Sequence, residues 1–250
     1  MSALRATSLP LVLLLPASLL ACREATSPEV PPLQIVLPAD LEQSYRVDAA
    51  RLAVRELGSS EDLKALPPEI PTELVASLFN ALVRVHATSL PARNRVVEAG
   101  IHTFPQPDVF EMLVKLSPDA VWAAAWRQGA ALTGNPAVDQ LVTRYQLRIE
   151  HYYLWTFGEY VVLRSAEPVN TAGLARRLSE VPGILLAEPN GWGGDGNDIT
   201  ARRDGDAWRL RYLLKWGDCP AGCISSHYWE FRVRESGAVT YLGEGDGKLP

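Results

Sequence analysis

Basic charge, long apolar runs and cysteine are all scarce in this sequence of 250 residues. Lysine and arginine number 24 against 29 aspartates and glutamates, which gives a formal charge of -5. Proteins that neutralise many phosphates carry a basic surface, so nucleic acid is not an expected partner. Hydrophobic residues make up 47% and charged residues 21%, a composition that indicates a globular protein and excludes disorder, collagen and coiled coil.

No stretch approaches the roughly 20 apolar residues that are needed to span a bilayer. The longest apolar run, Leu9–Leu20, contains two prolines. Arg5 precedes this run and the small residue Ala21 follows it, an order that is typical of an export signal. We therefore expect residues 1–21 to be a signal peptide that is absent from the mature chain.

The end of this apolar run, Leu19-Leu20-Ala21-Cys22, resembles the lipobox of bacterial lipoproteins. The resemblance implies that Cys22 becomes an acylated N-terminus and holds the protein on a membrane of the cell envelope without crossing it. Arg23 stands where inner-membrane lipoproteins often carry aspartate, which favours the outer membrane. A plain secretory signal with an incidental cysteine is the alternative. The proline-rich residues 22–39 are expected to be a lipidated tether.

Residues 40–107 are expected to form a helical N-terminal region. Apolar residues recur at mostly helical spacing over Leu41–Leu57, where Gly58 ends the pattern, and over Pro71–Ala87. These two patterns predict a pair of amphipathic helices. The periodicity then fades between residues 91 and 107, which predicts a connector with room for a short strand at Ile101–Phe104.

Residues 108–192 alternate between strand and helix patterns. The strand patterns are Val109–Leu116, Leu147–Trp155, Tyr160–Leu163 and Ile184–Ala187, and the helix patterns run from Pro118 to Gly129, from Asn135 to Tyr145 and from Asn170 to Glu180. The second and third strands should pair as a hairpin around the Gly158 turn. The predicted order is βαββαβ, and its first crossover consists of two helical pieces.

The stretch Thr171–Asn190, TAGLARRLSEVPGILLAEPN, contains a helix, a Pro-Gly break, a short apolar strand and then Glu188-Pro189-Asn190. It resembles the end of the inhibitor-like propeptides of subtilisin-type peptidases, and residues 109–190 resemble that ferredoxin-like domain as a whole. The resemblance implies a sheet that packs on a peptidase and a tail that occupies its cleft. A shared fold without this function is the alternative, because no peptidase follows.

Residues 193–250 are expected to form an antiparallel β-meander that extends this sheet, because apolar residues alternate over Trp208–Trp216 and His227–Val233. Cys219 and Cys223 are the only thiols besides Cys22, and outside the cytoplasm such a pair should form a structural disulfide between two strands. A redox-active pair or half of a zinc site are the alternatives. The predicted fold class is thus α+β.

Two further groups are candidate binding residues. Asp195, Asn197 and Asp198 look like one copy of a glycine-rich calcium nonapeptide, although a turn with Asx hydrogen bonds is favoured and no metal or other cofactor is expected. Tyr152, Leu154 and Tyr228 are candidates for an exposed binding patch. Along the predicted strands they alternate with the residues expected to face the core, so they should lie on the opposite face. The residues expected to face the core include Ile149, His151, Tyr153, Trp155 and His227.

The sequence predicts a cell-envelope lipoprotein that binds another protein or a peptide without catalysis, its partner being an envelope or secreted protein. No serine elbow and no phosphate-binding loop occurs, so no catalytic residue is assigned. A small secreted hydrolase that uses His227 or His102 is the alternative function. A purely structural role in the envelope is a third.

Overall fold

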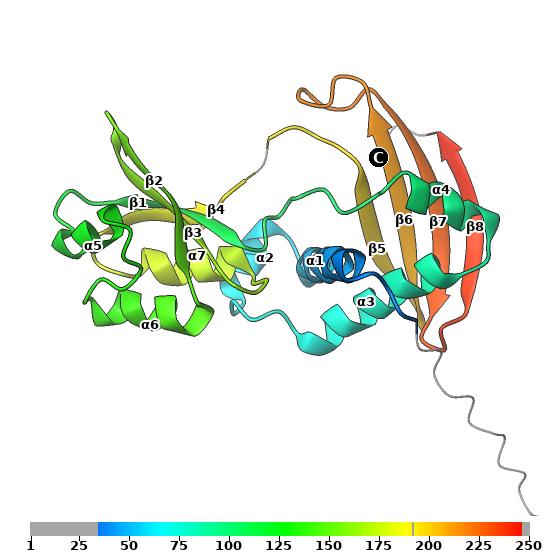
Figure 1. The fold of residues 1–250 in the computed structure, drawn as a ribbon, viewed down its shortest axis with the longest axis horizontal. Coiled ribbons are helices and arrows are strands. Elements are labelled where there is room, and N and C mark those ends of the chain that lie inside the picture. The colour runs from blue at the N-terminus through cyan, green and yellow to red at the C-terminus, as the bar shows by residue number, and fades with distance from the viewer. Residues whose placement is uncertain (1–34, 192, 247–250) are drawn as a thin grey trace, which may run out of the picture. The chain divides into compact units, whose positions relative to one another are not determined.

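The computed structural model describes residues 35–191 and 193–246, in which helices accompany two antiparallel four-stranded sheets (Figure 1). The fold is thus of the mixed α+β class that the sequence predicts. The helices are α1 (Ala39–Leu57), α2 (Ser60–Ala65), α3 (Thr72–Ala87), α4 (Pro91–Glu98), α5 (Ala124–Arg127), α6 (Pro136–Tyr145) and α7 (Thr171–Ser179). The strands are β1 (Glu111–Leu116), β2 (Arg148–Trp155), β3 (Gly158–Arg164), β4 (Ile184–Pro189), β5 (Asp198–Asp204), β6 (Ala207–Trp216), β7 (Ser225–Arg234) and β8 (Val239–Asp246).

The N-terminal region contains the two predicted helices, α1 and α3, and two more. A capping box begins α2, in which Ser59 accepts from the backbone of Asp62 and the Asp62 carboxylate accepts from the backbone of Ser59. Pro91 occupies the first turn of α4. The sequence does not predict α2 and α4 because helices of six and eight residues show too few repeats of the helical period. The segment Ile101–Phe104 is irregular, so the short strand suggested there is wrong.

Sheet A contains β1 to β4 in the order β2-β3-β1-β4, and all its neighbouring strands are antiparallel. Helices α5 and α6 lie between β1 and β2 in the chain, and α7 lies between β3 and β4. These three helices cover one face of the sheet (Figure 1). The core between them contains side chains that are almost fully buried, among them Met112, Trp126, Leu163, Leu174 and Leu178. The helix predicted from Pro118 is only a 3₁₀ turn followed by the short α5.

A β-bulge changes the face on which the side chains of β2 lie. The hairpin of β2 and β3 forms as predicted, but its register shifts between Ile149 and His151. A bulge inserts an unpaired residue and reverses the alternation beyond it. Tyr152 therefore packs against the core of sheet A. The alternation alone places three other residues of β2 in the core. These residues, His151, Tyr153 and Trp155, instead face away from the helices.

Sheet B is a separate meander of β5, β6, β7 and β8 in sequential order. The expectation that these strands extend sheet A is wrong. One face of sheet B, with Trp208, Leu210 and Phe231, belongs to the same core cluster as Leu52 of α1 and Leu78 of α3. The N-terminal helices, and not sheet A, therefore cover the apolar face of the meander. The sequence does not predict β5 because Ile199 is its only large apolar side chain.

None of the helices within residues 35–191 and 193–246 combines the length and the apolar character that crossing a membrane requires.

Candidate binding surface on sheet A

The face of sheet A that the helices leave open carries a group of aromatic side chains. Tyr153 and Trp155 of β2 stack with their ring centroids 4.8 Å apart. The Trp155 ring also lies 4.9 Å from that of Tyr160 on β3 and 5.2 Å from that of Phe157 in the hairpin turn. We call Tyr153, Trp155, Phe157 and Tyr160 the aromatic strip.

The aromatic strip is accessible to solvent at the end of the hairpin. Trp155 is 40% and Phe157 64% exposed, whereas tryptophan and phenylalanine are mostly buried in folded proteins. The ammonium group of Lys115 lies 5.4 Å from the Tyr160 ring and adds one cation to this face. Strand β2 is also an edge of the sheet, so its outer side has no neighbouring strand among the described residues. Exposed rings beside a free strand edge are features of a surface that binds a partner.

An ion pair holds the other side of the same hairpin. Arg127 donates to both oxygens of Glu159 at 2.6 and 2.7 Å, and Tyr152 donates a short hydrogen bond to the same carboxylate. The hydrogen bond from Arg127 is the main reason why the pKa of Glu159 is lowered. Partial burial raises the pKa of the Tyr152 hydroxyl. These contacts link β2 and β3 to Arg127 at the end of α5.

The three residues predicted as a binding patch do not come together. Tyr152 is partly buried beside the core of sheet A. Leu154 is exposed, but it lies two residues further along β2 on the same face as Tyr152. Tyr228 belongs to sheet B, where the guanidinium of Arg211 lies 4.5 Å from its ring. The aromatic residues of β2 that lie on the open face, Tyr153 and Trp155, are adjacent in sequence to the predicted Tyr152 and Leu154. The alternation of aromatic residues is visible in the sequence, but the bulge that turns them outward is not.

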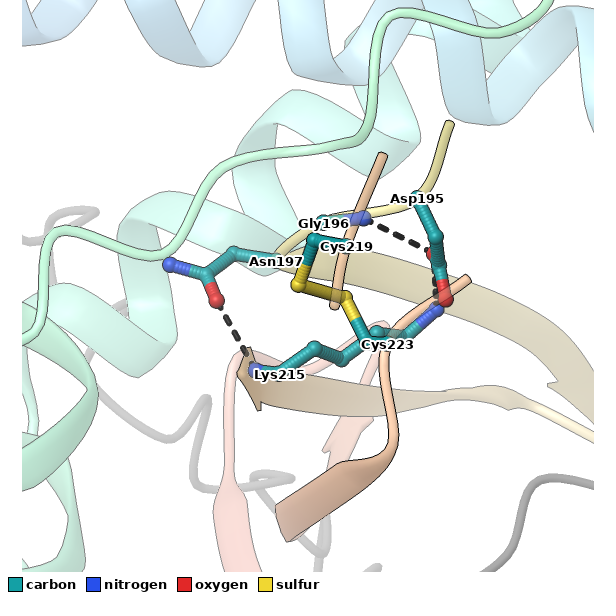
Figure 2. The surroundings of a disulfide bond; sticks show 6 residues. All are labelled: Asp195, Gly196, Asn197, Lys215, Cys219 and Cys223. Carbon is teal, nitrogen blue, oxygen red and sulfur yellow. Dashed lines mark hydrogen bonds and ion pairs between the residues drawn. A yellow bond between two sulfur atoms is a disulfide. The ribbon is translucent and has the colours of Figure 1, made fainter. Parts of the chain in front are cut away.

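The disulfide between Cys219 and Cys223 closes the loop from β6 to β7, as predicted (Figure 2). The backbone oxygen of Cys219 accepts a hydrogen bond from the backbone of Asp195 at 2.8 Å. The side chain of Asp195 also accepts from the ammonium group of Lys215 at 2.7 Å. The pair is thus part of a closed loop that is tied to the segment before β5.

The suggested calcium ligands use their oxygens within the protein. The carboxylate of Asp195 binds Lys215, and the amide oxygen of Asn197 accepts from the backbone of Lys215 at 2.9 Å (Figure 2). Asp198 instead accepts from Arg55 at 2.9 Å and from the backbone of Phe104 at 2.7 Å. Within the described residues no group of three or more histidine, cysteine or acidic side chains is arranged to hold a metal ion. The arrangement is that of a glycine-rich turn with Asx hydrogen bonds.

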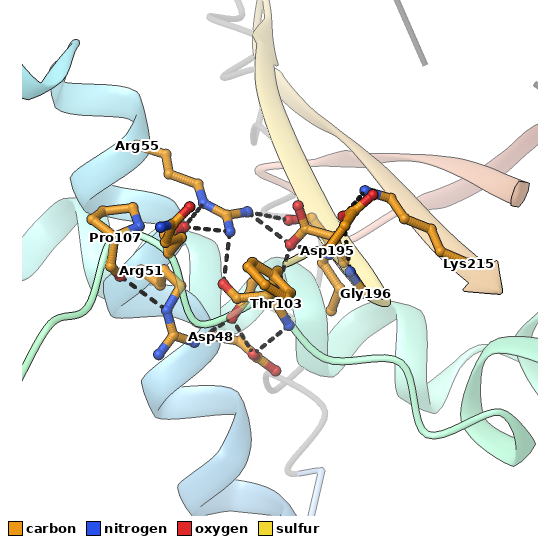
Figure 3. Close-up of polar contacts among 12 residues, drawn as sticks. Asp48, Arg51, Arg55, Thr103, Pro107, Asp195, Gly196 and Lys215 are labelled. Atoms are coloured by element: carbon orange, nitrogen blue, oxygen red, sulfur yellow. Dashed lines mark hydrogen bonds and ion pairs between the residues drawn. The ribbon is translucent and has the colours of Figure 1, made fainter. Parts of the chain in front are cut away.

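Charged side chains of α1 hold the irregular segment that follows α4 (Figure 3). Arg51 donates to the hydroxyl of Thr103 at 2.6 Å and to the backbone oxygen of Pro107 at 3.2 Å. Burial lowers the pKa of Arg51. Arg55 donates to the backbone oxygens of Phe104 and Gln106 at 2.8 and 2.6 Å. These side chains satisfy backbone groups that a strand would have satisfied through pairing.

His102 lies in the same segment and pairs with a buried carboxylate. Its Nδ1 is 2.6 Å from Asp48 Oδ2, and the side chain of Asp48 is only 3% exposed. The other oxygen of Asp48 accepts from the backbone and hydroxyl of Thr103 at 2.8 and 2.7 Å. The hydrogen bond to Asp48 raises the pKa of His102. The imidazole itself is 39% exposed, and its Nε2 has no hydrogen-bond partner within the described residues.

Tyr45 of α1 stands between two histidines. Its ring centroid is 5.8 Å from those of both His102 and His86. The hydroxyl of Tyr45 lies 3.2 Å from Nδ1 of His86. Burial, with a contribution from Asp48, raises the pKa of Tyr45 to about 12, so this hydroxyl is protonated at neutral pH. Burial and the nearby Arg93 lower the pKa of His86.

The remaining histidines have other surroundings. His227 of β7 lies between two carboxylates of β8, with Nδ1 2.6 Å from Asp246 and Nε2 3.8 Å from Glu244. His151 is exposed, and its ring centroid is 5.8 Å from that of Tyr153 in the aromatic strip. In the described part of the chain, no serine or cysteine lies among the hydrogen-bond partners of the four imidazoles.

Cys22, the predicted lipidation site, lies outside the described residues. Comparison with family models, with curated proteins and with solved structures found nothing that matches this chain.

Proposed function

We propose that the protein is a lipid-anchored component of the bacterial cell envelope that binds another protein through the open face of sheet A. The observation that carries the proposal is the aromatic strip, in which the large apolar rings of Trp155 and Phe157 are exposed. Aromatic residues are enriched in the centres of protein interfaces, where they contribute much of the binding energy.

Residues 108–192 are, in this proposal, a ferredoxin-like unit. The strand order β2-β3-β1-β4, the antiparallel pairing and the helices in both crossovers support this assignment. By their resemblance to subtilisin-type propeptides, residues 109–190 would use the sheet face opposite the helices to meet their partner. The aromatic strip is on that face. A secreted peptidase is thus one partner to examine, alongside other envelope proteins.

Removal of the aromatic strip tests the binding function. We expect the double variant Trp155→Ser, Phe157→Ser to capture its partner from envelope extract at least about tenfold less well than the unchanged mature chain, because truncating interface aromatics costs several kcal/mol. The partner would be identified by mass spectrometry, purified and titrated against both forms. Addition of a secreted subtilisin-type peptidase as a second probe reports whether the unit inhibits such enzymes.

Trp216 provides a matched control for this experiment. It is 48% exposed, like Trp155, but it ends β6 in sheet B. Trp216→Ser removes an exposed tryptophan without touching the aromatic strip, so binding should persist. Equal binding by the strip variant and the unchanged chain would reject the proposed surface.

The lipid anchor is proposed from the lipobox resemblance at Cys22. We expect Cys22→Ser to leave an unprocessed precursor, because in the lipoproteins that it resembles this cysteine becomes the acylated N-terminus after cleavage. Intact-mass measurement of protein from the native envelope would show the added lipid on the unchanged chain. An unmodified Cys22 in that measurement would contradict the anchor and the proposed outer-membrane location.

A secreted hydrolase is the second candidate function, and the pair of Asp48 and His102 favours it. A histidine that is oriented by a buried carboxylate through Nδ1 and whose side chain is 39% exposed has the form of a general base. A hydrolase of this kind would lose activity on a panel of esters and peptides when His102 is changed to Gln. Retention of all activity in His102→Gln, or no activity in the unchanged chain, leaves the binding function as the proposal.

A further inference from the structure

A row of three arginines crosses the outer face of sheet B, opposite the face that packs on the helices. Arg202 of β5 is directly opposite Arg209 of β6, which is directly opposite Arg232 of β7. Arg211, two residues after Arg209 on β6, lies on the same face in the next row. Like charges directly opposite each other destabilise a sheet, so such a row calls for a compensating negative charge.

Three carboxylates of the chain balance part of this charge. Nε of Arg232 lies 3.0 Å from Asp204, and its Nη2 lies 3.5 Å from Asp206. Arg211 donates to Glu230 at 3.4 Å. Asp204 and Asp206 are at the turn between β5 and β6, so they neutralise mainly the Arg232 end of the row.

Arg202 and Arg209 are less well compensated. Arg209 is 3.8 Å from Asp204 and 3.9 Å from Glu230, and its buried Nε makes no hydrogen bond within the described residues. The side chain of Arg202 has no hydrogen bond, ion pair or ring contact with the described part of the chain, although its backbone pairs with β6. The four arginines face three carboxylates, which leaves a local excess of one positive charge.

The same residues surround a depression in the sheet surface. It has a volume of about 200 Å³, and its lining consists of Thr200, Ala201, Arg202, Arg209, Arg211 and Glu230. The Glu230 side chain is only 14% exposed, whereas those of Arg209 and Arg211 are each 34% exposed. The guanidinium groups are therefore more accessible to a ligand than the carboxylate between them.

We propose that this depression is a binding site for a phosphate-type oxyanion, held by Arg202 and Arg209 with Arg211 beside them. A guanidinium presents several N–H donors in a plane, and these match two oxygens of a phosphate group. The bound anion would supply the negative charge that the row lacks.

Free phosphate compounds and phospholipid headgroups both present this chemistry. On a membrane-anchored protein, a site of this kind can bind a phosphate group from either source. A free phosphate compound reaches the site from solution, whereas a headgroup is held at a membrane surface. Inorganic phosphate probes the site alone. Vesicles of phosphatidylcholine, with and without phosphatidylglycerol, add the headgroup at a surface. The mature chain with Cys22→Ser is used throughout, so that no acyl chain contributes to vesicle binding.

Arg202→Gln and Arg203→Gln form a matched pair of variants. They remove the same charge at neighbouring positions, but Arg203 lies over the Trp208 ring at 4.2 Å and pairs with Glu235, away from the depression. We expect Arg202→Gln to weaken binding about tenfold, because the loss of a hydrogen bond to a charged group lowers affinity by about this factor. Arg203→Gln should change the affinity by less than about twofold.

Phosphate binding is measured from the chemical shifts of the arginine Nε–H groups and vesicle binding by co-sedimentation. Saturable phosphate binding that Arg202→Gln weakens supports the site and identifies a soluble ligand. Binding only to vesicles with phosphatidylglycerol, with the same loss in Arg202→Gln, supports the site and identifies the headgroup. Absence of saturable binding to both probes, or an equal loss in the two variants, would overturn the proposal.

Discussion

At the scale of single residues, the opposite surroundings of two histidines give a clear expectation for pH. The hydrogen bond to Asp48 raises the pKa of His102, and burial lowers that of His86. A raised pKa in the fold means that the stability gained by His102 is present below its unfolded pKa of about 6.5 and is lost as pH rises through the folded value. The contribution of His86 has the opposite sign and is lost as pH falls through its lowered pKa.

We therefore expect the two imidazoles to titrate on opposite sides of the ordinary histidine value. NMR titration of the ring protons measures this directly. Asp48→Asn removes the carboxylate, so the midpoint of His102 should fall, whereas Asp218→Asn, at an exposed aspartate, should leave it unchanged. If the midpoint of His102 is the same in Asp48→Asn and in the unchanged chain, the pairing of His102 with Asp48 does not set its pKa.

At the scale of elements, the disulfide of the loop from β6 to β7 should contribute modestly to stability. The double variant Cys219→Ser, Cys223→Ser should lose about 2 kcal/mol of unfolding free energy, because the closed loop is short and constrains the unfolded chain little. Urea denaturation measures this loss. The fold should persist, since the backbone of Asp195 still holds the loop at Cys219 and its side chain still holds Lys215 at the end of β6.

Thiol reactivity gives an independent measure of the same disulfide. Unfolded protein that has not been reduced should show no free thiol at either position. Rapid alkylation of both cysteines without a reductant would show that the bond is absent from the native protein.

The elements that the sequence predicts are those with several repeats of one period. A clear apolar pattern covers part of each of these helices and strands: α1, α3, α6, α7, β1, β2, β3, β4, β6 and β7. Strand β5 and helix α4 lack such a pattern, since their contacts with the rest of the fold use few apolar side chains. The segment around Thr103 was the hardest to predict, because distant arginines supply its hydrogen bonds.

The candidate sites were less predictable than the fold. A single unpaired residue between Ile149 and His151 decides whether Trp155 lies in the core or on the surface, and no residue in that stretch signals the bulge. The row of Arg202, Arg209 and Arg232 depends on the pairing register of three strands, one of which has no apolar alternation. Register is a property of the assembled sheet, so the sequence of one strand does not reveal it.

At the scale of the whole molecule, the N-terminal helices and the C-terminal meander should respond together to a change in their common core. Phe231 of β7 is fully buried, and its replacement by Ala should cost about 3–5 kcal/mol. We expect faster amide hydrogen exchange in α3 as well as in β7, because both pack in the same cluster. Leu163→Ala, a matched change in the core of sheet A, should accelerate exchange in α7 more than in α3. Unchanged exchange of α3 in Phe231→Ala would contradict a common core.

The cluster that joins α1 and α3 to sheet B also sets an order for folding. The helices are made early, and the strands that cover them begin only at Asp198. Contacts so distant in sequence form slowly, because a long loop must close first. Residues 112–187 have a core of their own and can fold while α1 and α3 are still uncovered. Under the export proposed above, a chain that leaves the channel N-terminus first would expose the apolar faces of α1 and α3 until its last strands arrive. A chaperone outside the channel would have that interval in which to bind them.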